Sequence, residues 1–98
     1  MLNRIVRMSF RPEEVDNFLA VFNASKHFIA ASEGCEGLAL LRDSSSPNVY
    51  FTYSYWKDEH CLNKYRYSDL FKEVWSKTKV LFNDAPQAWS LELADQVK

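Results

Sequence analysis

Alternation of apolar and polar positions predicts strands near both ends of the chain and in its middle. Residues Leu2–Phe10 alternate in this way, which predicts a half-buried first strand. One side of that strand carries, in order, Leu2, Arg4, Val6, Met8 and Phe10. A short strand is predicted over Leu38–Arg42, and a last one where Trp89, Leu91 and Leu93 alternate with polar residues.

The strand predicted over Val49–Trp56 differs from the others because both of its sides carry bulky groups. One side is formed by Val49, Phe51, Tyr53 and Tyr55. The other side is formed by Tyr50, Thr52, Ser54 and Trp56. Neither side is suited to water, so we expect cover on both. The alternation leaves open which side faces helices.

Helical spacing predicts three helical segments. The first begins around Arg11-Pro12-Glu13-Glu14 and ends around Ala31–Gly34, where Gly34 is suited to a left-handed conformation. Its apolar stripe is Val15, Phe18, Leu19, Phe22 and Ile29. Two more segments, Asp58–Tyr65 and Ser68–Phe82, each begin with a capping residue. The last stripe is Leu70, Phe71, Val74, Trp75, Leu81 and Phe82.

The order of these elements is β-α-β-β-α-β, with a polar hairpin turn at Asp43–Asn48. This order predicts a ferredoxin-like α+β fold, in which helices cover one face of an antiparallel sheet. The chain of 98 residues should form a single domain, 1–98. No element remains to cover the other sheet face, where Ile5 and Leu41 are expected, so we predict a homodimer whose sheets meet.

Composition excludes several classes of partner. The net charge is -1 and no basic stripe occurs, so nucleic acid is not expected as a partner. No apolar run is long enough to span a membrane and none resembles a signal peptide, so the protein is expected to be cytoplasmic. Cys35 and Cys61 are isolated, and His27 and His60 are expected at the surface, so we predict no metal site and no cofactor.

Four segments resemble the antibiotic biosynthesis monooxygenase (ABM) domain family. They are the turn Gly34–Gly37, the hairpin Arg42–Asn48, the strand end Tyr55-Trp56 and the run Tyr65–Phe71. The resemblance spans roughly Ile5 to Leu93 and implies a dimeric α+β barrel. It also implies a pocket between the helices and the third strand, and a chemistry in which a deprotonated phenol or quinol itself reduces O₂.

Haem-degrading relatives of this family use an Asn, Trp and His trio. The corresponding positions here are Val6, Tyr65 and Trp75. No imidazole stands at the position of the iron ligand, so the resemblance does not extend to haem binding.

The candidate site is the set of aromatic residues with polar tips around the third strand and the following helices. Rings stack on a planar ligand, and hydroxyl or indole groups bind its oxygens. We predict Tyr65 and Arg66 as catalytic residues, the first as a hydrogen-bond donor and the second as a charge. The predicted substrate-binding residues are Tyr53, Tyr55, Phe71 and Trp75. Arg7 and Arg42 are further candidates for stabilising a phenolate.

Two functions remain open from the sequence. One is a cofactor-independent monooxygenase acting on a small phenolic or quinol-like aromatic. The other is a non-catalytic dimeric domain that binds a small aromatic or serves in assembly. The aromatic residues with polar tips favour the first function, and the lack of histidines in the candidate site favours the second.

Overall fold

The computed structural model describes all residues, 1–98, as a four-stranded antiparallel sheet with helices on one face. The strand order is β2-β3-β1-β4, which confirms the ferredoxin-like prediction. The strands are β1 (Leu2–Ser9), β2 (Cys35–Arg42), β3 (Val49–Trp56) and β4 (Gln87–Glu92). The helices are the 3₁₀ turn η1 (Pro12–Glu14), α1 (Val15–Ala30), α2 (Glu59–Arg66) and α3 (Asp69–Lys79). None of these helices combines the length and the apolar character needed to cross a bilayer.

Two element boundaries differ from the prediction by three residues. The last helix ends at Lys79, three residues before Phe82, because the chain there turns back to pair with the end of β1. Phe82 forms an isolated bridge with Phe10, and the Asn83 N–H donates to the Ser9 carbonyl at 3.1 Å. The second difference is in β2, which begins at Cys35 rather than Leu38. Its first residues already pair with β3, where Cys35 lies opposite Trp56.

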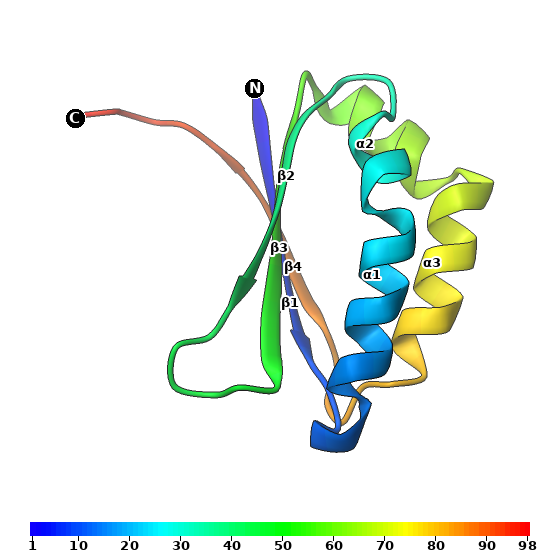
Figure 1. Cartoon of the computed structure of the whole chain (residues 1–98). Coiled ribbons are helices and arrows are strands. Elements are labelled where there is room, and N and C mark those ends of the chain that lie inside the picture. The colour runs from blue at the N-terminus through cyan, green and yellow to red at the C-terminus, as the bar shows by residue number, and fades with distance from the viewer.

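The helices cover the sheet face that carries Tyr50 and Trp56 from β3 and Met8 from β1 (Figure 1). The main core lies at one end of this layer and contains Met8, Phe10, Phe18 and Tyr50. The Phe10 ring is completely buried and stacks on Phe18 with 4.2 Å between ring centroids. A second cluster of Trp56, Cys61 and Leu62 closes the other end. The layer between sheet and helices is therefore anchored at both ends.

The opposite face of the sheet has no helix over it (Figure 1). Strand alternation and register place Ile5 of β1 beside Tyr53 of β3 and Trp89 of β4 on this face. Leu41, Trp89 and Leu91 remain 42–50% exposed. The predicted open apolar face is thus present in the single chain.

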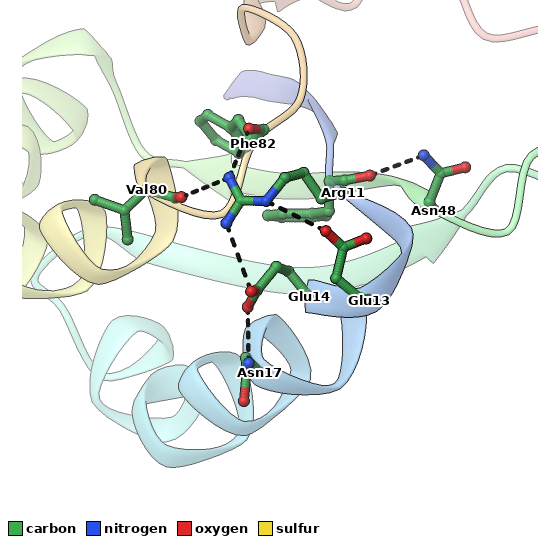
Figure 2. A network of polar contacts seen from close by, with 8 residues as sticks. Arg11, Glu13, Glu14, Asn17, Asn48, Val80 and Phe82 are labelled. Carbon is green, nitrogen blue, oxygen red and sulfur yellow. Dashed lines mark hydrogen bonds and ion pairs between the residues drawn. The ribbon is translucent and has the colours of Figure 1, made fainter.

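An arginine clamp joins the start of α1 to the end of α3 (Figure 2). The Arg11 guanidinium donates to the carbonyls of Val80 at 3.1 Å and Phe82 at 3.4 Å. It also pairs with Glu13 at 3.6 Å and with Glu14 at 3.5 Å. Through these contacts Arg11 fixes how closely the two helices approach each other at this end of the sheet.

Gly34 shapes the turn between α1 and β2. Its φ of +78° lies in the left-handed region, as predicted, and a Cβ atom built there would lie 2.4 Å from the Cys61 Sγ. Its carbonyl accepts a hydrogen bond of 2.8 Å from the Lys57 N–H. The lack of a side chain at Gly34 therefore lets Cys61, in the first turn of α2, pack directly against the backbone at Gly34.

Candidate functional site

A cavity of about 350 Å³ lies between the helices and the covered sheet face. This volume is within the range of small-molecule sites in proteins. Its floor is formed by β1 and β3, where Val6, Thr52 and Ser54 face the helices. Its walls come from all three α-helices and include Val21 of α1 and Trp75 of α3. Most of the lining is apolar.

Four aromatic rings make a continuous wall along this cavity. Trp56 stacks on Tyr65 at 5.1 Å between centroids, and Tyr65 meets the edge of Phe71 at 5.3 Å. Phe71 in turn lies nearly parallel to Trp75, at 5.8 Å and 10°. Such a wall offers ring faces and edges to a flat ligand.

The break between α2 and α3 brings these rings together. Ser68 caps α3 by accepting from the Phe71 N–H at 3.1 Å, and its hydroxyl donates to the Tyr65 carbonyl at 2.6 Å. In a single continuous helix, ten steps of about 100° each would leave positions 65 and 75 about 80° apart around the helix axis. Because Ser68 restarts the helix, Tyr65 and Trp75 both face the cavity.

Tyr65 supplies a hydroxyl donor to the cavity. The hydrogen bonds that Tyr65 accepts from Ser68 use its backbone carbonyl, and burial together with the nearby Cys35 thiol raises the pKa of its hydroxyl to about 12. At neutral pH the phenol is therefore protonated, so it donates a hydrogen bond and does not act as a base. A bound ligand oxygen would satisfy this donor.

Two arginines line the same cavity, and one of them was missed from the sequence. Arg66, the last residue of α2, was predicted, whereas Arg4 of β1 was not. Arg4 donates to the Ser90 Oγ at 2.9 Å, and burial together with the Arg66 charge lowers its pKa. The signal was available, because Arg4 falls on the same alternating side as Val6 and Met8, where a charge is unexpected.

Two of the predicted substrate-binding residues lie elsewhere. Tyr53 and Tyr55 project from the open face of the sheet, with 4.9 Å between their ring centroids, and do not line the cavity. The prediction that one of them forms the pocket floor is corrected, because the other side of β3, with Tyr50 and Trp56, faces the helices. Of the predicted set, Tyr65, Arg66, Phe71 and Trp75 do gather at the cavity.

The cavity lining holds no aspartate, glutamate, histidine or cysteine. His27 and His60 are exposed, as predicted, and Arg42 is exposed outside the cavity. Arg7 lies on the sheet side opposite the cavity, one residue from Val6. Side chains that could hold a metal do not gather in groups of three or more anywhere in the structure. The polar chemistry of the site therefore rests on hydroxyl and guanidinium groups and on the side-chain amide of Gln87.

Comparison with known proteins identifies relatives of this chain. Residues 1–76 match the sequence model of the family described as Antibiotic biosynthesis monooxygenase. No protein among the functionally curated ones matches the chain.

Solved structures share the fold. A crystal structure described as an antibiotic biosynthesis monooxygenase aligns with a TM-score of 0.91 at 16% identity, covering 97% of this chain and all of its own. A conserved protein from Methanosarcina mazei Go1 aligns at 0.87 and 22% identity, over 93% of this chain and 91% of its own. SnoaB, described as a cofactor-independent oxygenase from Streptomyces nogalater, aligns at 0.86 and 17% identity, over 98% and 95%.

Proposed function

The chain belongs to the antibiotic biosynthesis monooxygenase family, and from this membership we propose that it is a cofactor-independent monooxygenase of a small phenolic or quinol-type aromatic. The observation that carries the proposal is the aromatic-walled cavity of about 350 Å³, whose lining includes the phenol of Tyr65 and the guanidinium groups of Arg4 and Arg66. Flat rings and hydrogen-bond donors suit a flat substrate that bears oxygen.

The substrate supplies the electrons in this chemistry. A quinol and O₂ give a hydroxyquinone and water: a ring C–H bond is replaced by C–O, and the quinol is oxidised. One oxygen atom enters the ring and the other leaves as water, so all four electrons come from the substrate.

The cavity residues have distinct roles in this proposal. Phe71 and Trp75 stack on the substrate ring, and the Tyr65 hydroxyl donates to one of its oxygens. The positive charge of Arg66 lowers the pKa of the bound quinol and stabilises the anion that reacts with O₂. Because the lining offers no carboxylate or imidazole, the proton is released to solvent.

The test uses 1,4-dihydroxynaphthalene under ¹⁸O₂. The expected product is a hydroxynaphthoquinone with one ¹⁸O atom in the new hydroxyl, formed in proportion to enzyme concentration. Uncatalysed oxidation gives unlabelled naphthoquinone and is subtracted. Arg66→Gln should lower the labelled yield, whereas Arg42→Gln removes the same charge outside the cavity and should not. Formation of unlabelled quinone alone would contradict the proposal.

A second function is favoured by one observation, the lack of a carboxylate, imidazole or thiol in the cavity lining. Such a lining also suits a domain that binds a small aromatic without reacting with it. In that case the naphthalene quinol binds under nitrogen, and no label enters it under ¹⁸O₂.

We also propose that the protein is a homodimer formed through the open sheet face. The support is the row of exposed apolar side chains, including Leu41, Trp89 and Leu91, on a face that no helix covers. Light scattering at micromolar concentration should give twice the chain mass of 11.5 kDa. A value of one chain mass would contradict the dimer.

A further inference from the structure

Arg4 occupies an unusual place for a charged residue. It lies within β1, where the two following residues on the same side, Val6 and Met8, are apolar and Met8 is 3% exposed. Arg4 is itself half-buried, and its one hydrogen-bond partner in the protein is the neutral Ser90 hydroxyl. A charge taken partly out of water normally has an acidic partner, and this one has none.

Arg66 brings a second positive charge to the lining of the same cavity, although the residue itself is exposed. Its position at the end of α2 has a local explanation, since cations are stabilised near the C-terminus of a helix. That explanation does not apply to Arg4. The two guanidinium groups are near enough that the charge of Arg66 lowers the pKa of Arg4. Folding therefore brings two like charges together.

No acidic group of the chain neutralises this pair. The four ion pairs of the protein use Arg11, Lys64 and Lys77 as their cations. The cavity lining contains no carboxylate. The cavity lining thus combines two guanidinium groups that have no acidic partner with a wall of aromatic rings.

From this juxtaposition we infer that the cavity binds an aromatic carboxylate, with the carboxylate between Arg4 and Arg66 and the ring against Tyr65 and Trp75. Guanidinium groups bind carboxylates in pairs of parallel hydrogen bonds, and two of them surround a single carboxylate well. The inference names the substrate class of the site proposed above: a phenol or quinol whose ring bears a carboxylate.

The test compares 2-naphthoate with 2-naphthamide, its neutral isostere. Neither compound is a quinol, so their binding does not depend on turnover. Titration calorimetry with the wild-type chain should show the carboxylate binding about ten- to hundredfold more tightly, the effect of one or two charge-assisted hydrogen bonds. The preference should fall as salt is raised. Equal affinities, or no naphthoate binding at millimolar concentration, would overturn the inference.

Variants assign the preference to the two arginines. Arg4→Gln and Arg66→Gln should each lower naphthoate affinity and leave naphthamide affinity nearly unchanged. Arg42→Gln is the matched control, since Arg42 is an exposed arginine outside the cavity. A loss of preference in Arg42→Gln equal to that in Arg4→Gln would show that net charge alone is responsible, and would overturn the inference.

The outcome is separable from that of the proposed reaction. Selective naphthoate binding without ¹⁸O incorporation would support an aromatic-acid binding site and contradict the proposed monooxygenase activity. Label incorporation with equal affinity for naphthoate and naphthamide would support the monooxygenase activity and contradict the inference that the substrate bears a carboxylate.

Discussion

Arg11 and Arg4 show how differently the two ends of the helix–sheet layer are built. Arg11 contacts two carboxylates and two backbone carbonyls at the end where Phe10 is completely buried (Figure 2). Arg4, nearer the cluster of Trp56, Cys61 and Leu62, lines the cavity and has a neutral hydroxyl as its partner. The first arrangement satisfies the charge and stabilises the fold. The second leaves hydrogen-bonding capacity for a ligand.

The aromatic residues follow the same division. Phe10 and Phe18 pack at 4.2 Å between ring centroids, with Tyr50 beside them, and of these three only Phe18 lines the cavity. The rings of Tyr65 and Trp75 are half-buried and border empty space. Rings of similar size therefore lie either wholly within the core, as Phe10 does, or beside the cavity, as Tyr65 and Trp75 do, and substitutions should separate the two roles.

The largest effect is expected from Phe10→Ala. Removing a fully buried ring should lower the free energy of unfolding by about 3–5 kcal/mol. Trp75→Ala should lower it by less, because the ring is half-buried beside a cavity and truncation creates little new void. Urea denaturation of both variants measures the difference. Equal losses would show that the cavity end is as tightly packed as the core.

Alkaline titration should separate Tyr65 from the rest of the protein. Its pKa of about 12 lies above the ordinary value near 10, so the unfolded phenol loses its proton first. Stability is fully present below about pH 10 and falls as pH rises toward 12, by roughly 2–3 kcal/mol. The loss should be absent from Tyr65→Phe. If the free energy of unfolding falls equally with pH in the wild type and in Tyr65→Phe, the raised pKa of Tyr65 is refuted.

The two arginines should respond in opposite ways. Arg11→Ala removes two hydrogen bonds from a charged donor and two partly exposed ion pairs, which should reduce stability by about 1–2 kcal/mol. Arg4→Gln removes an unpaired, half-buried charge beside Arg66, so stability should stay level or rise. Thermal unfolding at low salt measures both. A large loss in Arg4→Gln would mean that Arg4 is structural.

The smallest effect is expected from Tyr65→Phe at neutral pH. Loss of one neutral hydrogen bond should weaken binding of a phenolic ligand such as 2-naphthol by about 1 kcal/mol. Stability should hardly change, because the hydrogen bonds that Tyr65 accepts from Ser68 use its backbone carbonyl and remain in the variant. Calorimetry gives the affinity, and the melting temperature serves as the control. Unchanged affinity would place the ligand away from this hydroxyl.

The sequence was sufficient for the fold because local signals agreed with one another. Caps at Asp58 and Ser68, the left-handed turn at Gly34 and strand alternation all point to the observed order of elements. The end of α3 was misplaced because Leu81 and Phe82 continue the apolar stripe of the helix. Their burial comes from the long-range bridge to Phe10, which no local pattern reveals.

The site was predicted only in part because its composition depends on which side of β3 faces the helices. Both sides carry large rings, so alternation could not select Trp56 over Tyr55. Arg4 was overlooked for a different reason. An arginine in an alternating strand is usually directed to solvent, so its place on the same side as Val6 and Met8 did not by itself indicate a cavity position.

The position of the ligand is the central claim, and the three tryptophan indoles report on it directly. Trp56 and Trp75 line the cavity, whereas Trp89 lies on the open sheet face. In an NMR titration with 2-naphthoate, the indole N–H signals of Trp56 and Trp75 should shift together with one affinity, and that of Trp89 should stay fixed. A shift of Trp89 without the other two would contradict the account.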